Sequence, residues 1–258
     1  MIRIFKIPLI TRFWFVLLLV SYLVFSYNYL GQWWHAACGT ILIIFFSERI
    51  WRREFLSVTG LKINWRIILY AGMLTFLVFY ISLSLIKLMA GNHDISIRPH
   101  SWRSGFHIAF YVLNEEIVLG AVILFLMVKR LNLKAVSATI YLALFFALMH
   151  FVFYRWVFDD RGILEVSTLI SLFMIGIFRN TLILYFDQIA YSWAFHFAWM
   201  LVMFGFDHTG GTHGESLAEF SRFNLYLGTW QMIIISSFLA SAGILFLHKK
   251  SKTAGQLL

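Results

Sequence analysis

Two adjacent carboxylates, Glu115 and Glu116, lie inside an apolar run that extends from Phe106 to Val128. A run of this length can cross a bilayer, which takes about 20 helical residues. A carboxylate in the membrane interior costs roughly 2.5 kcal/mol or more, so such residues are functional candidates. Two in succession require partners, protons or water, which makes this pair the first candidate for chemistry.

Two histidines occupy comparable positions in later apolar runs. His150 lies in the outer half of one run, and His196 lies near the middle of another. With a helical rise of about 1.5 Å per residue, Glu115 lies about 13 Å below the outer start of its run. All three residues therefore fall in one layer between the midplane and the outer leaflet, as expected if they border a common site.

Helical spacing predicts which neighbours share a face with these residues. Tyr111 precedes Glu115 by four positions, and Phe146 precedes His150 by four, so each pair lies on one face. Glu115 and Glu116 are about 100° apart around a helix, so both can border a cavity without pointing at one atom. One of the two is therefore predicted to support the other. Each histidine taken alone is also compatible with a simple interhelical hydrogen bond.

The elements that must position these residues are long apolar segments. Of the 258 residues, 61% are hydrophobic and 13% are charged, about half the charged fraction of a soluble domain. We predict an all-α membrane helix bundle that forms a single domain over residues 1–258, with its catalytic core at about 106–206. The eight predicted transmembrane helices are Phe13–Leu30, Trp34–Ile50, Ile67–Ala90, Phe106–Val128, Ala135–Phe158, Leu164–Tyr185, Ile189–Phe206 and Leu225–Leu247.

The distribution of charge predicts the orientation of the bundle. Lys and Arg concentrate in the segments on the side of the N-terminus, including Arg49–Arg66 and Lys129–Lys134, whereas most loop acids fall on the other side. The positive-inside rule then places both termini in the cytoplasm. The net charge of +9 is explained by loops beside anionic lipid, without a nucleic-acid partner. We predict a multi-pass protein of the bacterial cytoplasmic membrane.

Two further sets of polar residues are weaker candidates. Arg179 lies near the cytoplasmic end of its run, from which its side chain can extend to the interface. Asp207, His208, His213 and Glu215 lie in an outer glycine-containing segment and have the side chains of a metal site, but their spacing favours a solvated loop. Cys38 is the only cysteine, so an intrachain disulfide is excluded.

Three short motifs occur in order along these runs. They are Glu115-Glu116, Phe146-x-x-x-His150 and Ser192-Trp193-x-x-x-His196, and together they span about Asn114 to Met200. This pattern resembles the CAAX prenyl protease and bacteriocin-processing (CPBP or Abi) family of intramembrane glutamic endopeptidases. The first family motif usually continues to an arginine, where this chain has Gly120, and the third continues to an asparagine, where it has Met200.

The resemblance implies a protease that hydrolyses a peptide bond without a cofactor. Glu115, together with His150, would activate water, His196 would donate to the oxyanion, and Glu116 would orient His196 or a water. Arg179 or Arg103 would replace the missing arginine, and Asn114, Asn180 or a backbone amide would replace the missing asparagine. The predicted supporting and substrate-contacting residues are Asn114, Tyr111, Phe146, Trp193, Trp199 and Arg179.

Three alternatives remain at this level. Two histidines and a glutamate can hold Zn²⁺ with an open position, which would make the site a metal centre. Intramembrane Glu and His also build proton relays, as in proton-coupled transporters. Gly120 and Met200 are compatible with a scaffold or immunity protein that keeps the fold without activity. The expected partners are membrane lipid and a peptide or protein substrate.

Overall fold

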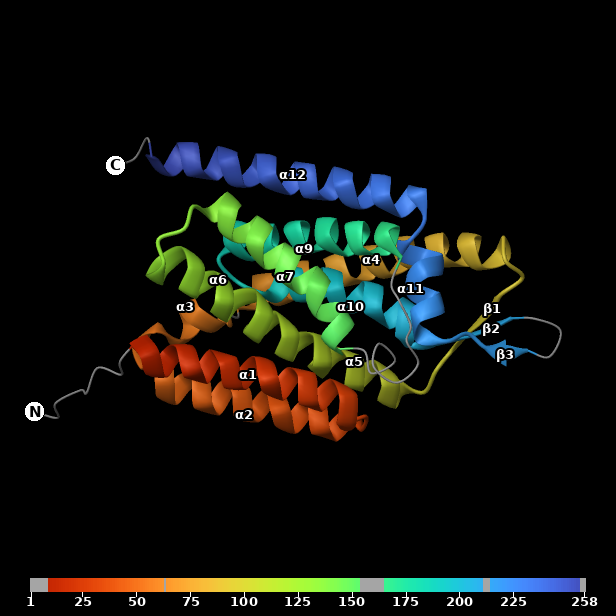
Figure 1. Ribbon diagram of the computed structural model, residues 1–258, viewed down its shortest axis with the longest axis horizontal. Helices are drawn as coiled ribbons and strands as arrows, with labels where there is room; N and C mark the ends of the chain where they lie inside the picture. Colours follow the sequence, from red (N-terminus) through yellow and green to blue (C-terminus); the bar gives the residue numbers. More distant parts are fainter. Residues whose placement is uncertain (1–8, 63, 154–164, 211–213, 256–258) are drawn as a thin grey trace, which may run out of the picture.

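The protein is a bundle of long helices that run side by side (Figure 1). The computed structural model describes residues 9–62, 64–153, 165–210 and 214–255. Within these residues the helices are α1 (Leu9–Tyr29), α2 (Trp33–Trp51), η1 (Arg52–Glu54), α3 (Phe55–Thr59), α4 (Trp65–Gly91), α5 (Trp102–Glu115), η2 (Glu116–Val122), α6 (Ile123–Phe125), η3 (Leu126–Arg130), α7 (Ala135–Phe153), α9 (Val166–Phe186), α10 (Ala190–Phe204), α11 (Glu219–Leu227) and α12 (Trp230–Gly255).

Each predicted apolar run lies mainly in a helix or a continuous series of helices, although the eighth run begins in α11 and continues in α12 after a break. Residues 154–158 of the fifth predicted run and Leu164 of the sixth lie outside the described residues. In the described part of the chain, the segments long and apolar enough to cross a membrane are Trp65–Gly91, Trp102–Arg130, Val166–Phe186 and Trp230–Lys250. The mainly helical class is therefore confirmed, and these segments indicate a membrane protein, while the count of eight crossings stays a prediction.

The segment Trp102–Arg130 is the central helix of the bundle. In its most apolar window 67% of residues are buried, whereas the corresponding value for α4 is 11%. From Glu116 onward the helix has π-type turns, and such turns occur frequently at functional sites. Apolar side chains cover both the buried centre and the exposed outer faces, which is the distribution expected when the surrounding solvent is lipid.

The bundle has two different ends. α1 begins and α12 ends at the same end, and the opposite end carries a small sheet (Figure 1). The first end also holds the basic segments around Arg52 and Arg130. The start of α1 and the end of α12 thus lie at the end that carries these basic segments, while the cytoplasmic orientation of the termini stays a prediction.

The sheet was not predicted from the sequence. Its strands are β1 (Ser96–Pro99), β2 (Phe206–Gly210) and β3 (Glu215–Ser216), which pair antiparallel in the order β1-β2-β3. β1 and β2 are about a hundred positions apart in the sequence, so no local pattern signals their pairing. The expectation of a solvated loop at 207–210 is wrong, because β2 pairs with β1 and the His208 side chain is fully buried. His213 lies outside the described residues.

His208 is held in its neutral form at this end of the bundle. The Tyr226 hydroxyl lies 2.6 Å from Nδ1 of His208. Burial lowers the pKa of His208 from 6.5 to about 4, and the positive charge of Arg222 acts in the same direction, against a smaller opposing effect of Asp207. Protonation of this side chain is therefore coupled to loss of the folded structure.

The pH dependence of stability follows from this shift. Because the folded pKa is below the unfolded value, the contribution of His208 is complete above pH 6.5 and is lost as the pH falls toward 4. Over that interval the free energy of unfolding should decrease by roughly 3 kcal/mol through this residue. The His208→Asn variant keeps a short polar group near the hydroxyl but cannot titrate. Thermal melting between pH 7 and 4 should therefore fall less steeply for the variant, and parallel curves would contradict the assignment.

Candidate active site

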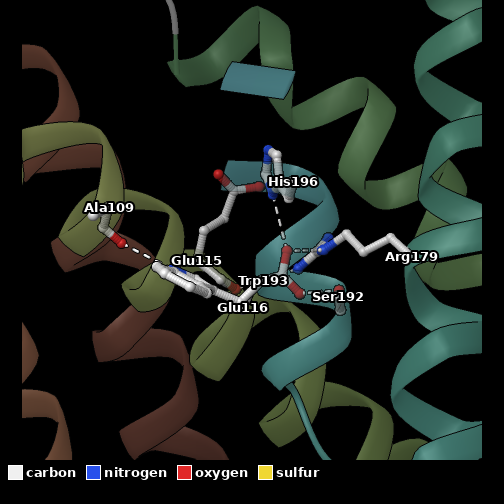
Figure 2. A network of polar contacts seen from close by, with 7 residues as sticks. All are labelled: Ala109, Glu115, Glu116, Arg179, Ser192, Trp193 and His196. Carbon is white, nitrogen blue, oxygen red and sulfur yellow. Dashed lines mark hydrogen bonds and ion pairs between the residues drawn. The ribbon is translucent and has the colours of Figure 1, made fainter. Parts of the chain in front are cut away.

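Glu116 is the centre of a buried network that joins three segments (Figure 2). Arg179 Nε donates to its Oε1 at 2.7 Å, and His196 Nδ1 lies 2.9 Å from the same oxygen. The Ser192 hydroxyl donates to Oε2. Glu116 is 0% exposed and Arg179 is 1% exposed. A buried carboxylate requires such a set of donors, and here the donors include a guanidinium.

α10 supplies two of these donors from one face. Ser192 and His196 are four residues apart, so both project from the same side of the helix toward the two oxygens of Glu116. Trp193 Nε1 donates to the carbonyl of Ala109 at 3.0 Å and thereby ties α10 to α5. Trp193 therefore positions the imidazole indirectly, by fixing the helix that carries it.

α9 supplies Arg179, which points into the bundle and not to the membrane interface. The interface interpretation of Arg179 is therefore wrong. A Cβ at Gly176, one turn earlier, would lie 3.2 Å from both Ala143 and Phe146, so glycine allows α9 to approach α7 closely. Cζ of Arg179 lies 4.6 Å from the centre of the Phe146 ring. Close packing of α7 and α9 thus places an aromatic face beneath the cation.

The guanidinium occupies the space beside Gly120. A Cβ at Gly120 would lie 2.7 Å from Ile183 Cδ1, 3.2 Å from Arg179 Nη2 and 3.4 Å from Glu116 Oε2. The positive charge expected at position 120 by resemblance is therefore supplied to Glu116 from α9. Arg103, the other candidate, lies exposed near the start of α5 over the Trp102 ring.

Glu115 differs from its neighbour in its partners. Its carboxylate lies beside the His196 ring (Figure 2), and it interacts electrostatically with His196 and Arg179. Tyr111 is a side-chain hydrogen-bond partner one turn earlier. Within the described residues, Glu115 Oε1 is buried and has no hydrogen-bond partner. An unpaired buried acceptor is costly, so this oxygen is a candidate for contact with water or a substrate.

His150 approaches the network from α7. Its Nδ1 lies 2.9 Å from the carbonyl of Phe146, so this nitrogen carries the proton and Nε2 is the acceptor. The Phe146 ring is in edge contact with both imidazoles, with its centre 4.8 Å from the ring centre of His150 and 6.2 Å from that of His196. His150 also interacts electrostatically with His196 and Arg179. The three predicted motifs are therefore neighbours in the structure.

Other predicted site residues have mainly structural contacts. The Asn114 amide accepts a hydrogen bond from Thr40 at 2.7 Å and donates to the Ala36 carbonyl at 3.0 Å, which joins α5 to α2. Asn180 donates to the Thr139 carbonyl at 3.1 Å. Trp199 packs against the main apolar core. Both asparagines thus hydrogen-bond to neighbouring helices, and Asn180 Oδ1 is buried without a partner among the described residues. Their role as oxyanion donors stays a prediction.

The structure also adds residues that motif reasoning did not assign a role. Ser192 contacts Glu116 directly, and its position four residues before His196 is the sequence signal that would have indicated this. Phe223 of α11 lies with its ring centre 5.8 Å from that of His150, a contact that depends on tertiary structure alone. Among the described residues, no three His, Cys, Asp or Glu side chains are grouped to hold one metal ion.

The chain matches no protein-family model, no curated protein and no solved structure. The site consists of two carboxylates and a guanidinium that are buried together within an apolar helix bundle, with the partly buried imidazole of His196 beside them.

Proposed function

We propose that the protein is an intramembrane endopeptidase that hydrolyses a peptide bond with water activated by glutamate and histidine. The observation that carries this proposal is the contrast between the two carboxylates. Glu116 is saturated by Arg179, Ser192 and His196, whereas Glu115 keeps an unpartnered oxygen beside the same imidazole. Glu116 positions the groups around it, and Glu115 is available to react.

Charge balance supports a reactive state with one mobile proton. Glu115 and Glu116 contribute two negative charges when ionised, and Arg179 contributes one positive charge. Since uncompensated charge is costly in a buried site, one additional proton on Glu115 or His196 makes the cluster neutral. With the proton on His196, Glu115 is a base and His196 is a cationic donor, which is the pairing that hydrolysis requires.

The reaction then proceeds through a water bound at Glu115. The water oxygen attacks the carbonyl carbon of the substrate while Glu115 accepts its proton. His196, whose Nδ1–H is held by Glu116, donates from Nε2 to the tetrahedral oxyanion, a role in which loss of one donor typically costs about 10²–10³ in rate. When the C–N bond breaks, Glu115 returns the proton to the leaving amine. His150 accepts a hydrogen bond at Nε2 and helps to hold the water.

The location of the site indicates the substrate class. The cluster is enclosed by helices that present apolar faces, so the peptide must reach it within or at the surface of the membrane. Leader peptides, sorting tails and prenylated peptides are membrane-associated substrates that satisfy this condition. The expected setting is a multi-pass protein of the bacterial cytoplasmic membrane, with the site toward the outer leaflet and both termini cytoplasmic.

The proposal is tested on the two histidines. Wild-type protein, His150→Ala and His196→Ala are expressed in a null background, and the termini of membrane proteins are compared by mass spectrometry. New termini should appear with the wild type only, and the His196→Ala rate should fall by about 10²-fold or more. A parallel arm adds a chelator and then Zn²⁺. Unchanged cleavage in both variants would reject the proposal, and loss with chelator and recovery with Zn²⁺ would replace it with a metal mechanism.

Proton-coupled transport is the second candidate, because the charge count leaves one transferable proton in the bundle. It predicts substrate flux into proteoliposomes that depends on a pH gradient, without new peptide termini. Flux without cleavage would favour this function, whereas cleavage without flux would exclude it.

A further inference from the structure

An apolar groove opens at the surface of the bundle. It has a volume of about 710 Å³ and lies between α1, the segment α6–η3 and α7. Its lining side chains include Phe13, Leu17, Leu126, Tyr141 and Phe145. Phe13 and Tyr141 are each 59% exposed, so the groove is open to the surroundings of the bundle. In a bilayer such a groove is filled by acyl chains.

The groove ends at a cationic group on the basic end of the bundle. Arg130 lines the groove and also lines a polar crevice of about 800 Å³ that includes Lys129 and Lys250. Arg130 Nη2 lies 2.5 Å and 2.6 Å from the two carboxylate oxygens of Glu54, and Arg12 Nη1 lies 3.1 Å from one of them. Two guanidiniums thus share one carboxylate, which leaves a net positive charge.

The Arg12 and Arg130 guanidiniums have hydrogen-bond donors that are not used. The Nε atoms of Arg12 and Arg130 are buried and have no hydrogen-bond partner within the described residues. The rings of Trp51 and Phe125 lie beneath the two guanidiniums, at 4.9 Å and 5.7 Å, and hold them in place. The other charged groups around the crevice are Lys129, Lys250, Glu54 and Asp187, and Asp187 is already paired with Lys62.

We propose that the groove and the crevice together bind one anionic phospholipid. Its acyl chain lies between α1 and α7, and its phosphate lies beside Arg12 and Arg130. A neutral lipid would leave one of the two guanidinium charges uncompensated, because Arg12 and Arg130 share the single carboxylate of Glu54. A free phosphate would leave the groove unfilled. Basic pockets between membrane helices on the cytoplasmic side bind anionic headgroups for the same reason. The proposed lipid site uses none of the residues of the proposed hydrolase, so its test does not depend on the proposed function.

The test measures lipid binding to the purified full-length protein in detergent. Native mass spectrometry is used to titrate phosphatidylglycerol, phosphatidylcholine and glycerol phosphate. Wild type should prefer phosphatidylglycerol over phosphatidylcholine by about fivefold for each cation engaged, and glycerol phosphate alone should not compete. Arg130→Gln should weaken phosphatidylglycerol binding by about fivefold, whereas Arg130→Lys should retain the preference. Leu17→Trp fills the groove and should weaken both lipids.

Arg49→Gln is the matched control. Arg49 lies at the same end of the bundle, but its side chain is 70% exposed and it is not part of the groove or the crevice. Its loss should leave the lipid preference unchanged. Equal binding of the two lipids by wild type, or an equal effect of Arg49→Gln and Arg130→Gln, would overturn the proposal. A photo-crosslinker at position 17 that captures a peptide segment and no lipid would also overturn it.

Discussion

Replacement of Glu115 with glutamine should reduce peptide hydrolysis by about 10²–10⁴-fold, the range that a general base contributes. The substitution preserves the shape of the side chain but removes the proton acceptor. Stability should stay the same or increase, because Glu115 Oε1 is a buried acceptor without a partner among the described residues. Buried charged groups in active sites commonly lower the stability of the folded protein. Removal of the Glu115 charge should therefore not lower that stability.

The neighbouring substitution Glu116→Gln is the matched comparison. It makes the same chemical change one residue further along the same helix. However, Glu116 is the ion-pair partner of Arg179 at 2.7 Å, and both side chains are buried. Removal of one member of a buried pair typically costs about 3–5 kcal/mol, because it leaves the other charge uncompensated. Both variants should lose activity, but only Glu116→Gln should melt at a clearly lower temperature.

Thermal melting in detergent and peptide cleavage in proteoliposomes distinguish the two roles. If Glu115→Gln destabilises the protein as much as Glu116→Gln does, Glu115 is a structural residue and the hydrolase mechanism is wrong. If Glu115→Gln is stable and fully active, another group must act as the base.

The second large effect is expected at Arg179. Arg179→Ala leaves Glu116 buried without its guanidinium and removes the contact with the Phe146 ring. The expected loss is about 3–5 kcal/mol of stability, with a corresponding loss of folded, active protein. Arg179→Lys should recover only part of this loss, because a lysine cannot reproduce the planar guanidinium over the ring.

Gly120→Arg should rescue Arg179→Ala although it is harmful by itself. In the wild type, a side chain at position 120 meets Ile183 and the Arg179 guanidinium, and it brings a second cation to the same carboxylate. In the Arg179→Ala background the contact with the guanidinium is gone and Glu116 lacks a cation, so only the end of the Ile183 side chain has to shift. An arginine at position 120 then lies four residues after Glu116, a spacing at which side chains on a helix interact.

The double variant therefore has a distinctive signature. Each single substitution lowers the melting temperature and the activity, and the combination should be better than either. Gly105→Ala in the Arg179→Ala background is the control, because a Cβ at Gly105 makes only an ordinary contact of 3.6 Å with Leu201. Strictly additive losses in the Gly120→Arg and Arg179→Ala double variant would show that Arg179 does not occupy the place of an arginine at position 120.

The membrane class, the helical segments and the key acidic and basic residues could be predicted from the sequence. Long apolar runs form helices whatever their neighbours are, because each helix satisfies its own backbone hydrogen bonds in lipid. Glu115, Glu116, His150 and His196 were recognisable for a related reason. A charged or polar side chain at membrane depth is costly, so its presence marks a candidate site.

The division of labour within the site was decided only by the tertiary structure. Glu115 and Glu116 have the same side chain. The packing of α9 and α10 against the central helix brings Arg179 and His196 to Glu116, and it leaves an oxygen of Glu115 without a partner among the described residues. The same holds for Arg179, which could reach the interface or the interior. Its direction depends on how closely Gly176 lets two helices approach. Contacts between segments distant in the chain depend on packing, which helical spacing within one segment does not encode.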